Sequence, residues 1–380
     1  MKKPRVDKKR AKLVFERLLK ALRANRYPYN VASLPQQQIP EDIRKDPLDH
    51  AVFLFYVCHL MRGAIQSDMA IRQLVVLRRH TPAFFQPELV STWDRDRIKN
   101  TLVSAIDYHG DEVARFWQVN SKALWERWQG DPRLIFRSTG CADSLRLAIT
   151  NKKIKGDKPQ DLFDHNWGFE GFQGKMASML AYFLMEAGLI GPFPIAPAVD
   201  FHLLRVMLST EVLKLPKELR IKGVRYDQMY PLGVKVLEQY CKETGVSTVE
   251  IGDALWAHST TACRAAPGNT SLDRTGERDE NGKKKIPRQL RVRQDNPEHV
   301  SQYEQSCHRC PVQDLCNWNV PAGPYYEVGK FMLYDRVRLE PHWVLFEGLP
   351  DHPTPKRLSA GQLAPQLEDQ LSLPLCTPDD

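Results

Sequence analysis

The sequence predicts an all-α protein, and three observations lead to this prediction. Apolar residues recur at helical spacing in one segment after another, and the alternating pattern of a half-buried strand is scarce. A helix-capping signature stands ahead of one of these segments, where Ser247 is followed by Glu250. With 42% hydrophobic and 26% charged residues over 380 positions, the chain can build one large core or two smaller ones.

The expected helices follow one another along most of the chain. The first, residues 9–23, places apolar side chains from Leu13 to Leu22 on one face and basic side chains on the other. Ser247 and Glu250 fit a reciprocal capping box at the start of the last helix. Further helices are expected, in chain order, at residues 48–62, 67–80, 95–107, 111–128, 141–151, 175–188, 200–213, 229–244 and 247–258.

Two segments lack this helical pattern. Residues 264–306 are polar, with few aliphatic side chains, and contain the basic run KKKIPRQLRVR. From about Leu349 onward the chain is rich in Pro, Gln and Leu, a composition typical of a mostly flexible tail.

Charge and hydropathy narrow the class of protein. The net charge of +8 favours an anionic partner such as nucleic acid. The apolar run AVFLFYVCHLM is too short to span a bilayer, and no apolar stretch follows the charges of MKKPRVDKKRAK, as a secretion signal requires. We therefore expect a cytoplasmic, nucleoid-associated monomer that does not contact membranes.

Three cysteines lie close together in QSCHRCPVQDLC, namely Cys307, Cys310 and Cys316. Cysteines clustered in this way in a cytoplasmic chain indicate metal binding or catalysis rather than a disulfide scaffold. We expect Cys263 as the fourth ligand, because a residue just after a helix end can face a loop that returns to it. Four thiolates suit either zinc or a [4Fe–4S] cluster, and their spacing leaves both open.

The run LWAHSTTAC…CHRCPVQDLC resembles the cluster loop of the endonuclease III family of helix–hairpin–helix DNA glycosylases. That family has the pattern Cys-x6-Cys-x2-Cys-x5-Cys. The last two intervals match, whereas about 43 residues separate Cys263 from Cys307. The resemblance implies a [4Fe–4S] cluster with a mainly structural and DNA-sensing role.

Two further segments carry the same resemblance. FEGFQGKMA is similar to the family's hairpin motif, and AVDFHLLRV is similar to its aspartate motif. The resemblance implies that Lys175 is the lysine nucleophile and Asp200 the catalytic aspartate. It also implies that the hairpin containing Gly171 and Gly174 grips a DNA phosphate, because glycines let backbone N–H groups approach it. His202 and Arg205 keep the rest of the aspartate motif.

The chemistry of these residue types fits that assignment. A partly buried lysine at a helix start is disfavoured in its protonated form, so its neutral amine can attack C1′ of a flipped nucleotide and form a Schiff base. A carboxylate that accepts backbone N–H bonds stays ionised and can stabilise a positively charged sugar. The sequence thus predicts a DNA glycosylase with AP-lyase activity through Lys175.

Some positions depart from the family pattern. Gln173 replaces the second hairpin glycine, Phe201 replaces the customary threonine, and the interval from Lys175 to Asp200 is several residues longer. A glycosylase that uses Asp200 and water alone therefore remains an alternative, as does a non-catalytic Fe–S protein that recognises a modified or structured duplex. The substrate base is not specified by any of these residues.

The resemblance implies a two-lobed architecture. Residues 46–196 correspond to the six-helix helix–hairpin–helix domain, and residues 1–45 with 197–325 to the cluster domain, which contains the enlarged basic loop 264–306. Residues 326–380 are a C-terminal extension. Double-stranded DNA is expected in the groove between the two lobes.

Other expected contacts lie outside the two central motifs. GAIQSDMAIRQL resembles a segment of that family. The resemblance implies that Gln66 fills the gap left by a flipped base and that Asp68 caps the next helix. QLSLPL resembles the hexapeptide by which bacterial proteins dock on the replication sliding clamp. The residues expected to extend the DNA footprint are Lys283, Lys284, Lys285 and Arg288, and those expected to bind the clamp are Gln370, Leu371, Leu373 and Leu375.

Overall fold

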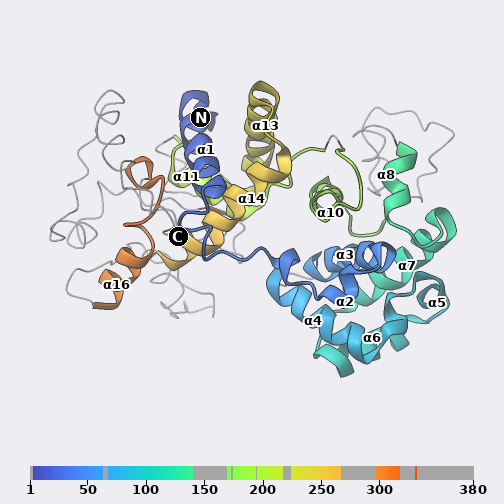
Figure 1. Cartoon of the computed structure of the whole chain (residues 1–380). Coiled ribbons are helices and arrows are strands. Elements are labelled where there is room, and N and C mark those ends of the chain that lie inside the picture. Colours follow the sequence, from blue (N-terminus) through green and yellow to red (C-terminus); the bar gives the residue numbers. More distant parts are fainter. Residues whose placement is uncertain are drawn as a thin grey trace, which may run out of the picture.

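The computed structural model describes residues 3–62, 67–139, 169–172, 174–193, 195–216, 224–266, 297–316 and 330–331. Helices dominate these ranges, which confirms the expected helical chain (Figure 1). The strands of the described residues form two short antiparallel ladders. One pairs β1 (Arg5–Val6) with β2 (Leu213–Lys214), and the other pairs β3 (Val224–Arg225) with β4 (Lys330–Phe331). Among the described helices, none has the length and apolarity to cross a membrane.

The helices mostly match their predicted ranges. In chain order the helical elements are α1 (Lys8–Arg23), η1 (Pro35–Gln38), α2 (Glu41–Arg44), α3 (Pro47–Arg62), α4 (Ser67–His80), η2 (Pro82–Phe85), α5 (Pro87–Ser91), α6 (Arg95–Ile106), α7 (Asp111–Trp128), α8 (Arg133–Thr139), α10 (Gly174–Glu186), α11 (Phe201–Ser209), α13 (Tyr226–Thr244), α14 (Thr248–His258), η3 (Ser259–Cys263), α16 (Pro297–Gln305) and η4 (Gln313–Leu315). The bounds of α4 and α7 are those predicted. The predicted helix 141–151 lies outside the described residues.

Two predictions about the helices were wrong. The helix expected over 200–213 ends at Ser209, because Leu213 leaves the helical path and pairs with Val6 in the β1–β2 ladder. The polar segment 264–306 contains a helix, α16, at its C-terminal end, which sequence periodicity did not reveal.

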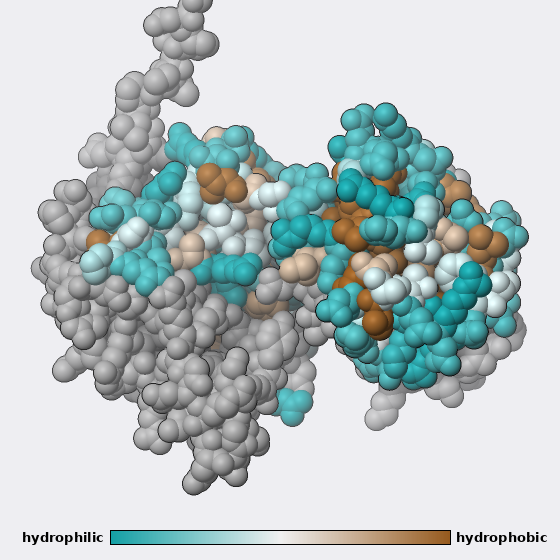
Figure 2. Space-filling model, turned by 90° about the horizontal axis from the view of Figure 1, so that it is seen from below, coloured by the Kyte–Doolittle hydropathy of each residue, from teal (hydrophilic) through white to brown (hydrophobic). Residues whose placement is uncertain are grey.

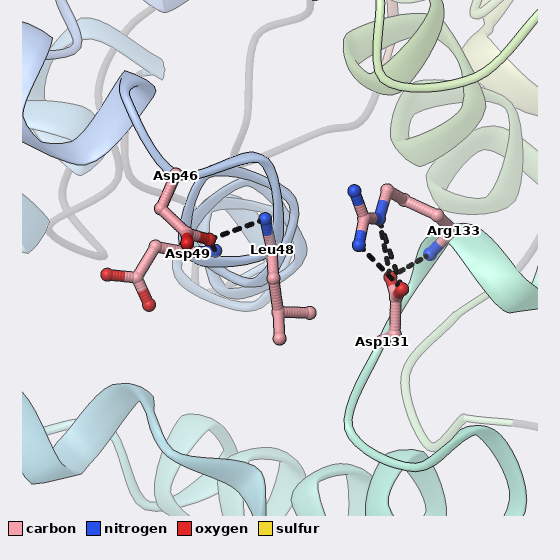
Figure 3. Close-up of polar contacts among 5 residues, drawn as sticks. All are labelled: Asp46, Leu48, Asp49, Asp131 and Arg133. Atoms are coloured by element: carbon pink, nitrogen blue, oxygen red, sulfur yellow. Dashed lines mark hydrogen bonds and ion pairs between the residues drawn. The ribbon is translucent and has the colours of Figure 1, made fainter.

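Side-chain caps define several helix starts. Asp7 accepts a hydrogen bond of 3.0 Å from the N–H of Arg10 at the start of α1. At α3 the Asp46 carboxylate accepts from the N–H groups of Leu48 and Asp49, both at 2.8 Å (Figure 3). Across from this cap, Asp131 binds the Arg133 guanidinium and its N–H at the start of α8 (Figure 3). Each carboxylate satisfies N–H groups that a helix start leaves without intrahelical partners.

The predicted capping box at α14 forms only in half. The N–H of Glu250 donates to Ser247 Oγ at 3.0 Å, as expected. The Glu250 carboxylate is paired instead with Arg23 of α1, whose Nε donates to Oε1 at 2.7 Å. A charged partner from another helix has replaced the local backbone N–H.

The first core gathers buried side chains between Ile39 and Leu184. Its central helix is α3, in which every residue from Ala51 to Leu60 is buried. Such a helix needs neighbours on all sides, and α3 contacts α2, α4, α7 and α10. Tyr56 stacks on Trp117 of α7 with ring centroids 4.4 Å apart. The surface over this group of helices is mostly hydrophilic, with separate apolar patches (Figure 2).

The second core joins the two ends of the described chain. Buried residues of α1, from Ala11 to Ala21, pack with residues between Val199 and Leu315. Helix α1 contacts α13 and α14 (Figure 1). Gly233 allows α13 to approach α11 closely, because a Cβ atom there would lie only 2.8 Å from Leu204 Cδ2.

Candidate active site and cysteine group

Lys175 is the second residue of α10 and is half-buried. The loop before it contains Gly171, whose φ of +77° lies in the left-handed region that favours glycine. A Cβ atom on Gly171 would also lie 2.9 Å from the Phe116 ring. Gly174 is the first residue of α10, and Gln173 lies outside the described residues. Gly171 is therefore required both by backbone conformation and by space.

Asp200 is the N-cap of α11. Its Oδ1 accepts hydrogen bonds from the N–H groups of His202 at 2.8 Å and Leu203 at 3.1 Å. The residue is only 6% exposed. These bonds satisfy two of the N–H groups that the start of α11 leaves without intrahelical partners.

Lys175 and Asp200 both act on His202. Burial lowers the pKa of His202 to about 4; the Asp200 carboxylate opposes this shift, and the positive charges of Arg205, Lys175 and Arg264 add to it. Such charge effects are appreciable only over short distances in a protein. The charges of Lys175 and Asp200, which are far apart in the sequence, therefore both lie close enough to His202 to shift its pKa.

The His202 ring is enclosed by aromatic and polar neighbours. Its Nδ1 lies 3.3 Å from Ser259 Oγ. The Phe201 ring is tilted against it and the Trp256 ring meets it edge-on, with centroid distances of 3.9 Å and 5.8 Å. With a pKa of about 4 the imidazole is neutral at pH 7, so it can exchange hydrogen bonds without adding positive charge.

Arg205 lies one turn further along α11 and is buried. Its Nη1 donates to the Ser259 carbonyl at 3.2 Å. Its positive charge also acts on Cys263, where it opposes the effect of burial on the thiol pKa. Ser259 and Cys263 are the two ends of η3, a π-helical turn. Turns of this type are frequent at functional sites, and this one separates the candidate active site from the cysteines by a single turn.

The four predicted cysteines form one group. Burial raises the pKa of Cys263 to about 12, and the neighbouring Cys316 raises it further. Burial likewise raises the pKa of Cys307 and of Cys310; Cys263 and Cys316 act on both thiols, and Cys307 also acts on Cys310. Every pair within the four is thus electrostatically coupled. No three cysteine, histidine or acidic side chains of the described residues meet at a point that could hold a single metal ion.

Cys241, the next cysteine upstream of Cys263, stands apart from this group. Cys241 lies within α13, and burial followed by the Glu238 charge raises its pKa to about 11. None of the four grouped cysteines contributes to that shift. Cys263 is thus coupled to the other three cysteines, whereas none of the four acts on Cys241.

His258 closes one side of the cysteine group. It is 1% exposed, and burial lowers its pKa to about 4. Its Nε2 lies 3.7 Å from Cys310 Sγ, whereas its Nδ1 has no hydrogen-bond partner among the described residues. The neutral ring is therefore a direct neighbour of one sulfur.

Helix α1 supports the cysteine loop from the other side. Arg10 Nη2 donates to the Leu315 carbonyl at 2.7 Å, and its Nε donates to the Thr210 carbonyl at 2.8 Å. Arg17 Nη1 donates to Asp314 Oδ1 at 2.6 Å. Part of the basic face of α1 is thus occupied by contacts within the protein.

Most of the other predicted site residues lie outside the described ranges. Asp68 is described, but it lies in the first turn of α4 and pairs with Arg72 at 2.9 Å, so the prediction that it caps this helix was wrong. The predicted residues outside the described ranges are Gln66, Lys283, Lys284, Lys285, Arg288, Gln370, Leu371, Leu373 and Leu375. Their roles stay predictions.

Ser259 and Arg264 were not singled out by the sequence. The helical path of α14 continues through η3 as far as residue 265, so both side chains follow directly from a helix that the sequence predicted. Extending its periodicity beyond His258 would have placed them near the site.

Comparison with models of known protein families, with curated proteins and with solved structures gives no match. The function is therefore argued from the residues of this chain.

Proposed function

We propose that this chain is a DNA-binding protein of the helix–hairpin–helix class. Within that class, we propose that it is a DNA glycosylase that excises a damaged or modified base and cleaves the resulting site through Lys175. The observation that carries the proposal is the approach of Lys175 and Asp200 to one neutral histidine, His202. An amine and a carboxylate at a shared site are the two groups that this reaction requires.

The proposed reaction uses the two groups in sequence. After losing its ammonium proton, the Lys175 amine forms a bond to C1′ of a flipped nucleotide, while the bond from C1′ to the base nitrogen breaks and the base keeps the electron pair. Asp200 stabilises the positive charge that develops on the sugar and accepts the proton released by the lysine. The sugar ring then opens to give a Schiff base, from which elimination cleaves the strand on its 3′ side.

The cationic surroundings suit a nucleic acid. The positive charges of Lys175 and Arg264 act on His202, and the loop that contains Gly171 leads into α10. A positive site beside a glycine-containing loop favours a phosphate group. The two cores, one between Ile39 and Leu184 and the other formed by α1 with residues after Val199, support a two-lobed arrangement in which DNA lies between the lobes.

Cys263, Cys307, Cys310 and Cys316 would hold the proposed [4Fe–4S] cluster. Four mutually coupled thiols are a donor set that this cluster accepts, although zinc takes the same donors. When bound, the cluster supplies a rigid, redox-active centre. The residues of this chain supply the setting, because Arg10 and Arg17 tie the loop to α1. A brown purified protein with visible absorbance supports the cluster, whereas a colourless zinc protein contradicts it.

The proposal is tested with duplexes that contain oxidised, deaminated, alkylated and hypermodified bases. Borohydride should trap a covalent adduct between DNA and the native protein, and Lys175→Ala should abolish it. Lys122→Ala is the matched control, because Lys122 is an exposed helical lysine, 61% exposed and paired with Glu126. Asp200→Asn should abolish base release while leaving DNA binding in place.

The remaining outcomes identify the alternatives. Base release without a trapped adduct indicates a glycosylase in which Asp200 activates water. Tight binding to one of the duplexes without any base release contradicts an enzyme and indicates a non-catalytic DNA-binding protein.

A further inference from the structure

The geometry points to Asn120 as the residue that positions the loop before Lys175, with His59 holding Asn120 in place. Asn120 lies in the middle of α7 and is fully buried. This inference rests on the proposed function, because it gives Asn120 a role at the same site. Asn120 is a positioning residue, since it acts through the loop and not on the DNA.

Asn120 binds both backbone groups of Glu170. The N–H of Glu170 donates to Asn120 Oδ1 at 2.6 Å, and Asn120 Nδ2 donates to the Glu170 carbonyl at 2.9 Å. Buried backbone N–H and C=O groups need hydrogen-bond partners, which a neighbouring strand often supplies. Here one side-chain amide supplies both partners for Glu170. The plane and direction of the loop at Glu170 are therefore set by one side chain of α7.

His59 of α3 sets the orientation of that amide. Its Nε2 lies 2.8 Å from Asn120 Nδ2, and its Nδ1 lies 2.8 Å from the Phe55 carbonyl. Because Nδ2 is a donor, Nε2 must accept, so the ring proton is on Nδ1 and is donated to Phe55. Reversing the Asn120 amide would place its oxygen against both Nε2 and the Glu170 carbonyl. The network allows one orientation only.

Two neighbours on α7 complete the contact with the loop. Phe116 lies one turn before Asn120 and fills the space where a side chain on Gly171 would be. Arg115 Nη2 pairs with Glu170 Oε1 at 3.0 Å. The loop also packs on α3, since the Phe172 ring lies 5.3 Å from the His59 ring. Helices α3 and α7 thus hold a loop whose second hairpin glycine is replaced by Gln173.

Loss of this hold should displace the start of α10 and the lysine on it. Asn120→Asp keeps the shape of the side chain but replaces a donor by an acceptor, opposite the Glu170 carbonyl and His59 Nε2. Small displacements of a nucleophile lower reaction rates steeply. We expect the single-turnover rate of Schiff-base trapping to fall about 10- to 100-fold. The Kd for DNA should change far less, because other contacts remain.

Gln118→Glu is the matched control. Gln118 lies on the same helix, and its Nε2 donates to the Trp93 carbonyl at 2.8 Å, away from the loop. The change from amide to acid is the same in both variants. Gln118→Glu should leave the trapping rate unchanged, and an equal loss in both variants would show general destabilisation and overturn the inference.

Amide hydrogen exchange tests the loop without relying on enzyme activity. In Asn120→Asp, peptides covering residues 169–176 should exchange about tenfold faster or more, whereas peptides from α13 should not change. Asn120→Ser introduces no charge and serves as a second variant in case Asn120→Asp folds poorly. It should also speed the exchange of the peptides covering residues 169–176. Unchanged exchange in both variants overturns the inference. A native protein that traps no DNA counts against the proposed function instead, and leaves the exchange result valid.

Discussion

Tyr182 of α10 donates a hydrogen bond to the carboxylate of Asp253 of α14. This contact connects a helix of the first core to a helix of the second. Gln36 of η1 joins it, with its Nε2 donating to the Tyr182 hydroxyl at 3.3 Å. Burial raises the pKa of Asp253 to about 7, and the charges of Glu186 and Glu250 raise it further, against the opposing effect of Tyr182. A carboxyl group that is neutral below pH 7 thus lies at the junction of the cores.

We predict that Asp253 makes the protein less stable as the pH rises. Its pKa in the folded protein is above the ordinary value of 3.8, so its contribution to stability is complete below about pH 4 and is lost as the pH rises through 7. Between pH 6 and pH 8 this residue should cost about 1 kcal/mol of unfolding free energy. Urea unfolding of the native protein and of Asp253→Asn at both pH values measures it. If Asp253→Asn loses as much stability between pH 6 and pH 8 as the native protein does, the prediction is contradicted. The control is Glu126→Gln, which replaces an exposed carboxylate of α7.

We predict the opposite pH dependence for His59. Burial lowers its pKa to about 4, below the ordinary value of 6.5, so the unfolded chain takes up the proton first. Stability from this residue is complete above pH 6.5 and is lost as the pH falls toward 4. Between pH 7.5 and pH 5 the loss should be about 2 kcal/mol.

The measurement is the difference between two proteins, because His202 and His258 also have pKa values lowered to about 4. Urea unfolding at both pH values should show a smaller loss in His59→Gln than in the native protein. Equal losses in the two proteins would mean that His59 takes up a proton as readily in the folded protein as in the unfolded chain, which contradicts the prediction.

Replacing Gly171 should be more harmful than replacing another left-handed glycine. Gly188 has a φ of +67° and nothing within 4 Å of an added Cβ atom, so Gly188→Ala carries only backbone strain of about 1 kcal/mol. Gly171→Ala carries the same strain and also forces the Phe116 ring to move, which adds roughly 1–3 kcal/mol. Thermal or urea unfolding compares the two variants directly. Equal destabilisation would show that the Phe116 ring moves without cost.

The pair formed by Arg17 and Asp314 should hold the cysteine loop on α1. The two side chains are 2.6 Å apart, with Arg17 11% and Asp314 36% exposed. A double-mutant cycle with Arg17→Ala and Asp314→Ala should give a coupling of about 1 kcal/mol. With the proposed [4Fe–4S] cluster bound, both variants should also lose iron faster than the native protein when a chelator is added. Coupling near zero, with unchanged iron loss, would show that α1 does not hold the loop through this pair.

The basic segment between Cys263 and Cys307 should strengthen DNA binding. Helix α16 begins at Pro297, so a deletion of residues 270–296 leaves it intact. Removing the basic residues should weaken DNA affinity and flatten its dependence on salt, because fewer counterions are released. A variant of full length in which Lys283, Lys284, Lys285 and Arg288 are replaced by Gln separates charge from length. Unchanged affinity and salt slope in both would contradict the prediction.

Local sequence patterns were sufficient for most helices and for some residues of the site. Helices α4 and α7 have the predicted bounds, because the spacing of apolar side chains on a helix depends only on neighbours along the chain. The helical pattern was also predicted to begin at Asp200, which caps α11 by binding N–H groups two and three residues away.

Contacts between distant segments could not be predicted in this way. Glu250 was expected to bind its own helix start, but Arg23, from the other end of the chain, takes its carboxylate. Leu213 was expected in a helix, but its pairing with Val6 places it in a strand. In both cases a partner more than 200 residues away offers a charge or a backbone ladder that no local pattern can anticipate.

The sequence by itself determined that this protein is helical and which cysteines, lysine and aspartate deserve attention, because these depend on residue type and short spacing. Only the tertiary structure decided that four cysteines are coupled in one group and that the charges of Lys175 and Asp200 act on the same histidine. The physical reason is that electrostatic coupling depends on distance through space, which the packing of α10, α11 and α14 sets.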